Sequence, residues 1–279
     1  MRAEPQSILI TGASSGIGAA LAAAYAGPGV ALHLGGRDRG RLGMTVDRCR
    51  VLGASATGTI MDVTDRAGMA GWIAESNARR PLDLVIANAG ISAGGDSGVA
   101  TESNLSPEDA SETTRRVFAV NIDGVANTVL PALELIRARP MPGTGRLRRG
   151  WRGQIAIMSS LAGFRGMPSA PAYAASKALE KAWGEALAAR LNDEGIAVTV
   201  ILPGFVATPM TEHNPFPMPM LMPAEQAAHI IKRRLQRRPA RLAFPFPMYA
   251  GAWFLSLLPP WLTDPLLAAL PDKSAKKPE

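Results

Sequence analysis

The sequence predicts an α/β fold with one doubly wound parallel sheet and helices on both of its faces. Short apolar runs alternate along the chain with longer helix-like stretches, which is the pattern of parallel βαβ units. A glycine-rich turn joins the first apolar run to the first helical stretch. The chain of 279 residues has 47% hydrophobic residues and 28 glycines, enough for one large core with many tight turns. No internal repeat and no second domain are visible in the sequence.

Each predicted strand is a short apolar run. In chain order, the predicted strands are residues 7–10, 30–34, 55–61, 82–87, 154–158, 197–202 and 241–244. The predicted helices lie between them, at residues 17–26, 38–51, 65–79, 107–119, 122–138, 172–193 and 224–236. The fourth helix has a start signal, because Ser106 is placed to cap it and Pro107 lies in its first turn.

The turn after the first strand reads Thr11-Gly12-Ala13-Ser14-Ser15-Gly16-Ile17-Gly18. A strand, a glycine turn and a helix N-terminus in this order form an anion-binding cradle. Glycines let the backbone approach a pyrophosphate, and the free N–H groups and the helix dipole favour its negative charge.

Tyr173 and Lys177 are four residues apart in a predicted helix, so both side chains leave the same face. A free phenol has a pKa of about 10 and is a poor acid or base at pH 7. A neighbouring ammonium favours the phenolate and makes Tyr173 a usable proton donor or acceptor. Ser160 follows the predicted strand 154–158, at the sheet edge where open α/β folds place their sites.

With Asn88-Ala89-Gly90, Asn121 and Pro203-Gly204 in the same order, these motifs resemble the classical short-chain dehydrogenase/reductase (SDR) family, over residues 7–210. The resemblance implies a single Rossmann-type catalytic domain, which we place at residues 1–244, and a nicotinamide cofactor. It also implies a catalytic tetrad, which falls on Asn121, Ser160, Tyr173 and Lys177. Asn121 is then expected to hold a water that links Lys177 to solvent.

The resemblance also implies the cofactor contacts. The glycine turn holds the pyrophosphate, Asp62 and Val63 meet the adenine, and Asn88, Ala89 and Gly90 pass along a ribose. Tyr173 and Lys177 face the nicotinamide ribose. After the sixth strand, the expected contacts are Pro203, Gly204, Val206 and Thr208, with the backbone near Val206 holding the carboxamide. An ordinary βα turn is the alternative interpretation of each of these segments.

The end of the second predicted strand favours NADP(H) over NAD(H). An acid there would accept hydrogen bonds from a ribose hydroxyl and repel a 2′-phosphate. The sequence has Gly36 at that place and Arg37 after it, and a guanidinium binds phosphate with a fork of donors. Ser14 is placed to add a hydroxyl contact. Stacking on the adenine, or exposure to solvent, is the alternative for Arg37.

These residues predict an oxidoreductase that interconverts a carbonyl and a secondary alcohol by hydride transfer, with Tyr173 as proton donor or acceptor. One alternative is a nucleotide-binding sensor or interaction protein without turnover; another is a 3-oxoacyl-type reductase. A lid at about residues 208–223, rich in methionine and proline, indicates a bulky hydrophobic or lipid-like substrate. Packing of these methionines onto the body is the alternative.

Composition limits the partners and the location. The single cysteine, Cys49, is predicted to be a buried helix residue, and it excludes an internal disulfide framework. No apolar signal region precedes the first strand, so we expect a cytoplasmic protein. The three histidines have no metal-ligand spacing, so no metal is predicted. The net charge is +7, but no aromatic or zinc motif supports a nucleic-acid partner. The arginine-rich segment 137–152 is predicted to be a surface loop away from the cofactor.

Residues 245–279 form a predicted C-terminal extension with apolar helices and a basic tail, not an independent domain. Its first apolar run is shorter than the about 20 residues that span a bilayer, and Pro259-Pro260 separates it from the second. Tryptophan and tyrosine between basic flanks favour contact of residues 246–270 with a membrane surface. The alternative is packing on a second subunit, since the resemblance also implies a homodimer or homotetramer.

Overall fold

A computed structural model describes residues 4–92, 106–141, 150–212, 214 and 217–268. Its main sheet has seven strands in the order β3-β2-β1-β4-β5-β6-β9, and all recorded pairings in it are parallel. The strands are β1 (Ser7–Ile10), β2 (Ala31–Gly36), β3 (Ser55–Ile60), β4 (Leu84–Ala87), β5 (Gly153–Met158), β6 (Ile196–Pro203) and β9 (Arg241–Phe244). A small second sheet pairs β7 (Val206–Ala207) with β8 (Met222–Pro223).

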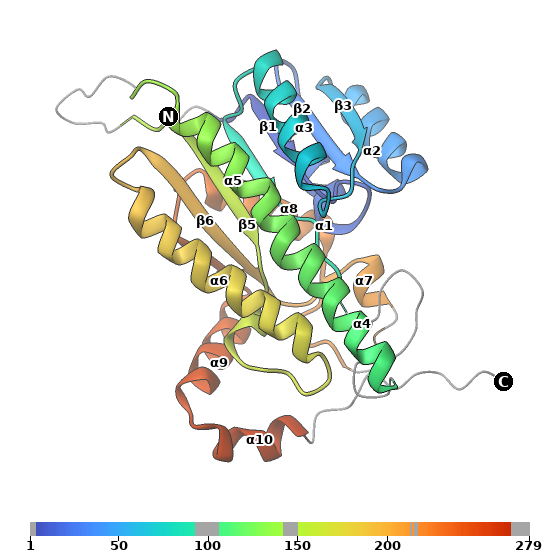
Figure 1. Cartoon of the computed structure of the whole chain (residues 1–279), viewed down its shortest axis with the longest axis vertical. Coiled ribbons are helices and arrows are strands. Elements are labelled where there is room, and N and C mark those ends of the chain that lie inside the picture. The colour runs from blue at the N-terminus through green and yellow to red at the C-terminus, as the bar shows by residue number, and fades with distance from the viewer. Residues whose placement is uncertain (1–3, 93–105, 142–149, 213, 215–216, 269–279) are drawn as a thin grey trace.

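Helices cover both faces of the sheet (Figure 1). One layer contains α3 (Arg66–Arg79), α4 (Pro107–Phe118), α5 (Gly124–Arg137) and α6 (Pro171–Leu191). The opposite layer contains α1 (Gly16–Tyr25), α2 (Arg39–Val51) and α8 (Ala224–Leu235). The α1, α2 and α8 layer packs on one cluster of buried apolar side chains and the opposite layer packs on two others, so the predicted doubly wound fold is confirmed.

The strand order reverses between β1 and β4, because β1 pairs with β2 on one side and with β4 on the other. In open α/β sheets, a crevice outside the carboxyl ends of the strands forms at such a switch point. β1 and β4 are buried along their whole length and are apolar except for Ser7, as expected for strands covered on both faces. The sheet therefore presents one site edge, where β1, β4, β5 and β6 end.

The sequence predicted the position of every strand of the main sheet and of the seven helices between them. The largest difference is at residues 119–123, where two separate helices were predicted. The structure instead has one continuous helix with a π-helical turn, η2 (Ala119–Asp123), between α4 and α5. The Gly124 N–H reaches back to the Ala119 carbonyl across five residues, and Asn121 lies inside this wider turn.

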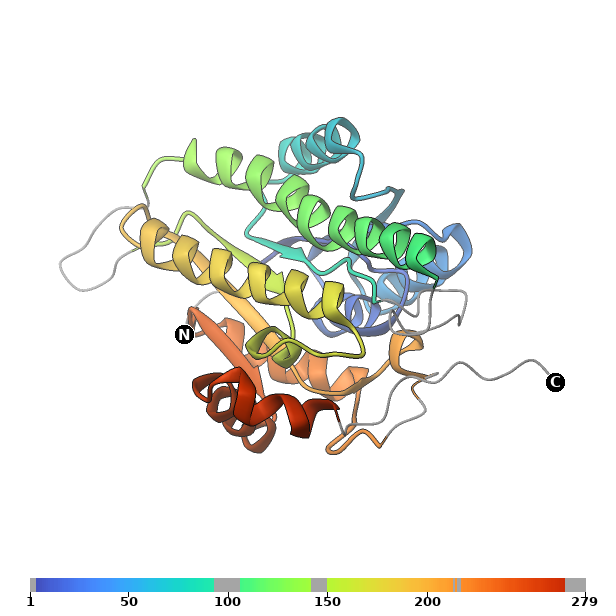
Figure 2. The same cartoon turned by 60° about the horizontal axis from the view of Figure 1, so that its bottom comes forward.

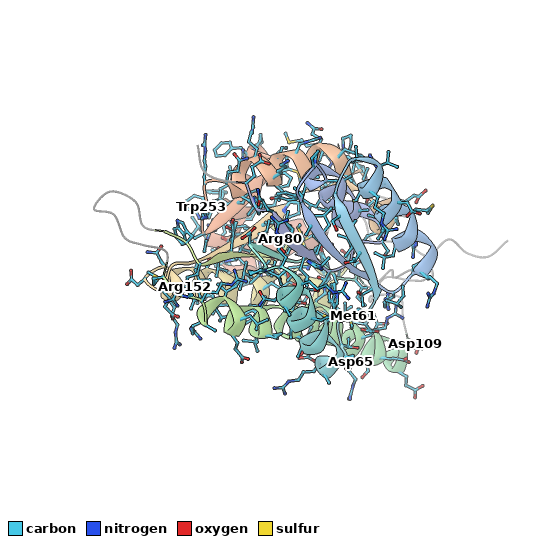
Figure 3. The ribbon with its side chains drawn as sticks, turned by 90° about the horizontal axis from the view of Figure 1, so that it is seen from above. Met61, Asp65, Arg80, Asp109, Arg152 and Trp253 are labelled. Carbon is cyan, nitrogen blue, oxygen red and sulfur yellow. The ribbon has the colours of Figure 1, made fainter. Side chains whose placement is uncertain are left out.

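Several helices start with a capping side chain. Asp38 accepts a hydrogen bond from the Arg41 N–H at 2.8 Å, and Asp65 accepts one from the Gly68 N–H at 3.0 Å. Ser106 caps α4 as predicted, accepting from the Asp109 N–H at 3.2 Å. Figure 3 shows Asp65 and Asp109 at the starts of their helices. These caps satisfy backbone donors that would otherwise lack partners.

The arginines of the 137–152 segment that are described lie near the amino end of β5, away from the site edge. Arg139 donates to the carbonyls of Leu82 and Arg152 at 2.9 and 3.0 Å, and Arg137 pairs with Glu194 at 2.6 Å. Arg146, Arg148 and Arg149 lie outside the described residues. Cys49 is a buried residue of α2, as predicted, and burial raises the pKa of its thiol to about 11.

Two apolar helices follow β9, namely α9 (Phe246–Leu257) and α10 (Pro260–Ala268). They lie together below the sheet, next to the short helix η3 (Leu161–Phe164) that follows β5 (Figure 2). One face of α9 packs on η3 and β6 through Met248, Tyr249 and Ala252. Residues 269 and 270 of the predicted membrane segment, and the basic tail, lie outside the described part of the chain.

One helical run among the described residues, Glu108–Arg137, is long and apolar enough to cross a membrane by length and composition. It is the continuous run formed by α4, η2 and α5. Its α5 section buries an apolar face that includes Val125, Val129 and Leu133. Core helices of soluble proteins meet the same two criteria, so this run alone does not indicate a membrane span.

Candidate functional site

The predicted site residues come from separate parts of the sequence but follow the carboxyl ends of neighbouring strands. The glycine turn follows β1, Arg37 follows β2, and Asp62 follows β3. Asn88 follows β4, Ser160 follows β5, and Gly204 follows β6. Because the strands are parallel, all these segments lie at one edge of the sheet.

Two glycines of the turn after β1 have a backbone that favours glycine. Gly12 and Gly16 have φ angles of 67° and 54°. A Cβ on Gly12 would lie 2.8 Å from the Cα of Ala89, and one on Gly18 would collide with the Gly12 carbonyl oxygen. The turn is therefore packed too closely to hold side chains at Gly12 and Gly18.

Thr11 and Asn88 join the loops that follow β1 and β4. The Thr11 hydroxyl accepts hydrogen bonds from the backbone N–H groups of Asn88 and Ala89 at 3.0 and 3.1 Å. The Asn88 amide donates in turn to the Thr11 carbonyl at 2.9 Å. The two loops that border the switch point are thus held in one fixed arrangement.

The end of β2 has a glycine, Gly36, followed by a cationic side chain, Arg37. A Cβ on Gly36 would lie 3.0 Å from the Ser14 hydroxyl, so this glycine leaves space above the glycine turn. Arg37 is exposed. Burial raises the pKa of Asp62, but hydrogen bonds from Thr64 and the charge of Arg37 outweigh it and lower the pKa overall. Asp38 is engaged with Arg41 at 2.8 Å, and hydrogen bonds from Arg41 lower its pKa.

Ser160 lies two residues after β5 and is the N-cap of η3. Its Oγ accepts a hydrogen bond from the Ala162 N–H at 3.1 Å. This contact uses a lone pair of the hydroxyl and leaves its proton available. Ser160 is therefore prepared to donate a hydrogen bond, which is what a carbonyl oxygen accepts.

Tyr173 and Lys177 lie one turn apart on α6, and the Lys177 Nζ is 5.6 Å from the centre of the Tyr173 ring. The lysine is only 4% exposed. Its Nζ donates to the Met158 carbonyl at 3.0 Å and to Oε1 of Glu180 at 2.9 Å. The ammonium thus lies at the carboxyl end of β5, beside the phenol.

Asn121 is fully buried in η2 and links three segments. Its Oδ1 accepts from the Ile91 N–H at 2.8 Å, and its Nδ2 donates to the Ile91 carbonyl and to the Ser176 hydroxyl, both at 2.9 Å. The Ser176 hydroxyl donates to the Tyr173 carbonyl at 2.8 Å. Asn121 therefore ties the β4 loop to the helix that carries Tyr173 and Lys177.

The segment after β6 approaches the glycine turn. A Cβ on Gly16 would lie 3.1 Å from the Thr208 side chain, so these two loops are neighbours. The Thr211 hydroxyl donates to the Val206 carbonyl at 2.7 Å and accepts from the Thr208 N–H at 3.0 Å. A short helix, α7 (Pro209–Glu212), follows. Of the predicted lid, residues 213, 215 and 216 lie outside the described part.

The backbone geometry at this edge of the sheet fits a dinucleotide cofactor. The cradle has glycines where side chains would collide, and Ser15 at the N-cap of α1 makes no side-chain capping bond. The first N–H groups of α1 therefore have no side-chain cap and point toward the turn. In the part of the chain that is described, no group of three or more His, Cys, Asp or Glu side chains is arranged to hold a metal ion.

A family model described as short chain dehydrogenase matches residues 6–216. The chain belongs to this family. It is 34% identical to an uncharacterized oxidoreductase of Myxococcus xanthus, over 92% of this chain and 94% of the relative. As a short-chain dehydrogenase it is an oxidoreductase that acts on alcohol or carbonyl groups.

Solved structures of short-chain dehydrogenases have the same fold. One from Mycobacterium paratuberculosis, bound to NAD, is 23% identical with a TM-score of 0.70, covering 90% of this chain and all of its own (100%). Another from Beutenbergia cavernae is described as an NAD(P)-dependent gluconate 5-dehydrogenase with NADP bound at low occupancy. It is 25% identical with a TM-score of 0.69, over 89% and 96% of the two chains.

The sequence reasoning missed three residues that shape this short-chain dehydrogenase site. Thr11 was visible as the first residue of the glycine motif, and Ser176 directly precedes Lys177. Glu180 lies three residues after Lys177, which is helical spacing for a contact. A charged residue in a predicted helix usually faces solvent, so only the structure identifies Glu180 as buried.

Proposed function

We propose that the protein is an NADP(H)-dependent oxidoreductase that interconverts a carbonyl and a secondary alcohol. The observation that carries this proposal is the placement of the Lys177 ammonium 5.6 Å from the centre of the Tyr173 ring. After the same strand end, that of β5, the Ser160 Oγ accepts a hydrogen bond from the Ala162 N–H, which leaves its hydroxyl proton available. These groups supply a proton donor and a hydrogen-bond donor for one carbonyl oxygen.

In the proposed mechanism, the substrate oxygen lies between the Ser160 hydroxyl and the Tyr173 phenol. The bound cofactor supplies or accepts the hydride. During reduction, Tyr173 gives its proton to the oxygen, and the Lys177 ammonium stabilises the resulting phenolate. Ser160 orients the oxygen, and Asn121 fixes α6 relative to the β4 loop. For oxidation of an alcohol, the same groups act in the reverse direction.

The preference for NADP(H) rests on the end of β2. Gly36 places no acid there, and Arg37 follows it as an exposed cation close enough to lower the pKa of Asp62. Ser14 lies against Gly36 and adds a hydroxyl. A guanidinium and a hydroxyl suit a 2′-phosphate.

The competing proposal is a nucleotide-binding sensor without turnover. It is disfavoured because all four tetrad residues are present in the chain. Consumption of NADPH with a panel of ketones and aldehydes tests the two. Tyr173→Phe should retain cofactor binding, measured by fluorescence, and lose turnover by about 100-fold or more. Wild-type activity of Tyr173→Phe, or wild-type binding without any turnover, would contradict the proposed function.

We propose a bulky, apolar substrate, which includes 3-oxoacyl chains. Its support is the set of exposed apolar side chains around the lid, namely Met210, Met220 and Leu221. Methionine adapts its shape to irregular apolar ligands. The panel should therefore compare ring ketones, long-chain ketones and 3-oxoacyl thioesters with short polar ketones. A higher kcat/KM for the short polar ketones would exclude this substrate class.

We also propose that the enzyme, placed in the cytoplasm, contacts an anionic membrane surface through α9 and α10. Their outer side carries large apolar side chains, of which Phe246 is 72% and Trp261 is 75% exposed. The others are Trp253, Phe254, Leu257 and Leu262. Aromatic side chains of this kind are suited to the headgroup region of a bilayer.

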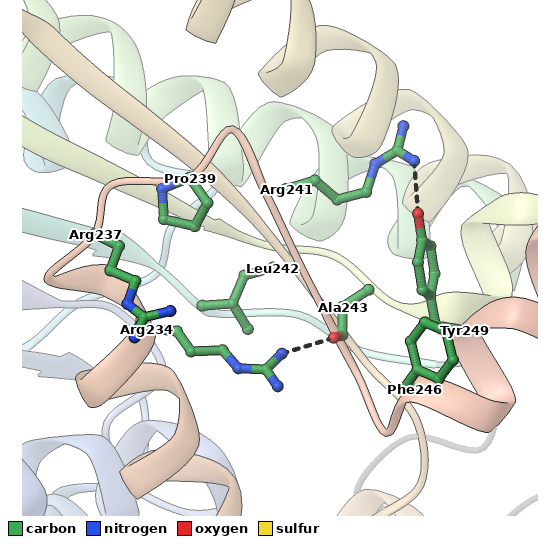
Figure 4. Close-up of a pocket in the computed structure, with 8 residues that line it drawn as sticks. All are labelled: Arg234, Arg237, Pro239, Arg241, Leu242, Ala243, Phe246 and Tyr249. Carbon is green, nitrogen blue, oxygen red and sulfur yellow. Dashed lines mark hydrogen bonds between the residues drawn. The ribbon is translucent and has the colours of Figure 1, made fainter.

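A basic pocket of about 570 Å³ adjoins this apolar surface (Figure 4). It is lined by Arg234, Arg237, Pro239, Arg241, Leu242, Ala243, Phe246 and Tyr249. Arg234 donates to the Ala243 carbonyl at 3.0 Å, and Arg241 bonds to Glu185 and Tyr249 at 2.7 and 3.2 Å. Each guanidinium has five N–H donors, so these contacts leave donors for a lipid phosphate. The positive charge of this region favours an anionic surface over a second copy of the same cationic chain.

Flotation with phosphatidylcholine vesicles, with and without phosphatidylglycerol, tests this contact. The full chain should float only with the anionic vesicles. The double variant Phe254→Ser, Trp261→Ser should not float, while the control Leu130→Ser, an exposed apolar residue of α5, should float normally. A protein that stays in solution as a dimer or tetramer, and becomes monomeric in the double variant, would instead assign this surface to a second subunit.

A further inference from the structure

A buried acid lies directly behind Lys177. Glu180 is on α6, three residues further along, and is 0% exposed. Its Oε1 accepts a hydrogen bond from the Lys177 Nζ at 2.9 Å. The same Nζ donates to the Met158 carbonyl at 3.0 Å and lies 5.6 Å from the centre of the Tyr173 ring. The Lys177 ammonium therefore pairs with a buried carboxylate and also lies beside the phenol of Tyr173.

Stability does not explain this pair. Replacing a buried ion pair with apolar side chains is often neutral or stabilising, because both charges lose their hydration. Oε2 of Glu180 has no hydrogen-bond partner among the described residues. The adjacent Ser159 hydroxyl donates to the Lys177 carbonyl at 2.7 Å. Burial raises the pKa of Glu180 to about 7, against the opposing attraction of Lys177.

We propose that Glu180 is a positioning residue that holds the Lys177 ammonium at the end of β5 and offsets part of its charge at Tyr173. This inference rests on the proposed role of Tyr173 as proton donor and acceptor. An unpaired cation beside a phenol favours the phenolate strongly, and a paired anion reduces that effect. The pair thus keeps the phenol protonated over a wider pH range, as a proton donor to a carbonyl requires.

The groups around the pair come from three elements. Lys177 and Tyr173 are on α6, and Met158 and Ser159 come from the end of β5. Asn121 of η2 approaches through the Ser176 hydroxyl. Among these neighbours of Glu180, only Lys177 carries a charge at neutral pH. Removing the charge of Glu180 therefore leaves that cation without its counterion.

Titration of the cofactor-free protein tests the proposal without relying on activity. The chain has three tyrosines, so ¹³C labelling of the ring carbon that bears the hydroxyl gives a simple spectrum. The Tyr173 signal is assigned by its loss in Tyr173→Phe. In Glu180→Gln, the phenolate of Tyr173 should form at a pH about one unit lower than in the wild type. Glu180→Asp, which keeps the charge, should restore most of the wild-type titration.

The matched control is Glu185→Gln on the same helix. Glu185 pairs with Arg241 at 2.7 Å and with Lys181 at 3.9 Å. The substitution therefore removes the same charge as Glu180→Gln, but from cations other than Lys177. Its Tyr173 titration should equal that of the wild type. An unchanged titration in Glu180→Gln, or a shift to higher pH, would overturn the proposal. The second result would mean that Glu180 acts only by keeping Lys177 protonated.

The wild-type protein provides a measurement that does not depend on the folding of a Glu180 variant. The Tyr173 signal should show a second, smaller step between about pH 5 and pH 8, where a buried carboxyl with a raised pKa titrates. Absence of this step would also overturn the proposal. If the step is present but Tyr173→Phe retains full turnover, the charge relationship holds and the proposed catalytic function fails.

Discussion

The Asn121 amide nitrogen donates to the Ser176 hydroxyl at 2.9 Å, and that hydroxyl donates to the Tyr173 carbonyl at 2.8 Å. This chain of bonds joins the π-helical turn η2 to the first turns of α6. The helix that carries Tyr173 and Lys177 is thereby fixed to the β4 loop, since Asn121 also bonds to both backbone groups of Ile91. The position of the phenol depends on residues that do not touch the reacting atoms.

Ser176→Ala should therefore affect both stability and turnover. It leaves one buried N–H of Asn121 without an acceptor, which costs about 1–3 kcal/mol. We expect a lower Tm and a reduced kcat with little change in cofactor affinity. Thr128→Val is the control, because the Thr128 hydroxyl is equally buried but donates only to the Gly124 carbonyl of its own helix at 2.8 Å. Equal losses of kcat in both variants would contradict the positioning role of Ser176.

Arg37→Ala tests the choice of cofactor. Loss of a charge-assisted contact to a 2′-phosphate should raise the KM for NADPH by about tenfold or more, which corresponds to about 1.4 kcal/mol. The KM for NADH should stay within about twofold. Arg39→Ala removes an exposed cation two residues away and should leave both values unchanged. If Arg37→Ala weakens both cofactors equally, the arginine stacks on the adenine instead.

Gly184→Ala should destabilise the protein. Gly184 lies on the buried face of α6, where a Cβ would collide with Val200 and lie 3.1 Å from Ile157. We expect a loss of about 1–3 kcal/mol in urea unfolding. Gly71→Ala in α3 is the matched control, since no atom lies within 4 Å of its Cβ position. That change should stabilise by up to about 1 kcal/mol, because alanine is the better helix former.

Stability should depend on pH through Glu180. Burial raises the pKa of this carboxyl from 4.5 to about 7, so the folded state binds the proton more tightly than the unfolded state. The resulting stabilisation is complete below about pH 4.5 and is lost as the pH rises through about 7. At about 1.4 kcal/mol per pH unit, the change is of the order of 3 kcal/mol. As the pH is raised from about 4.5 to about 8, the urea midpoint of unfolding should fall less in Glu180→Gln than in the wild type.

Strand positions were predictable because the buried parallel strands are dominated by apolar residues, as in β1 and β4. The positions of Ser160 and Gly204 at the site edge followed from the ends of those runs. The π-helical turn could not be predicted, because one extra residue per turn barely alters the apolar periodicity around Asn121. Glu180 was missed for a different reason, since sequence patterns do not show that a charged helix residue is paired in the core.

The roles of the tetrad, the cofactor contacts and the domain boundary at residue 244 stay predictions. In the structure, β9 ends at Phe244 and α9 begins at Phe246, so the boundary coincides with a change of element. It is not a point of separation, however. The Gly204 N–H donates to the Phe244 carbonyl at 2.8 Å, and a Cβ on Gly204 would lie 2.9 Å from the Met248 sulfur. The extension packs against the predicted cofactor loop.

The short helix η3 has a consequence for how this enzyme can change over evolution. Ser160 caps its start, and the helix contacts α9 through Phe164 and Tyr249, whose ring centres are 5.7 Å apart. Arg165, directly after it, bonds to Thr263 and Asp264 of α10 at 3.0 and 2.6 Å. A lineage that shortened or replaced the last two helices would therefore have to rebuild the support of Ser160 at the same time. Under the proposed membrane contact, the surface that meets the bilayer and the support of Ser160 would then be inherited together.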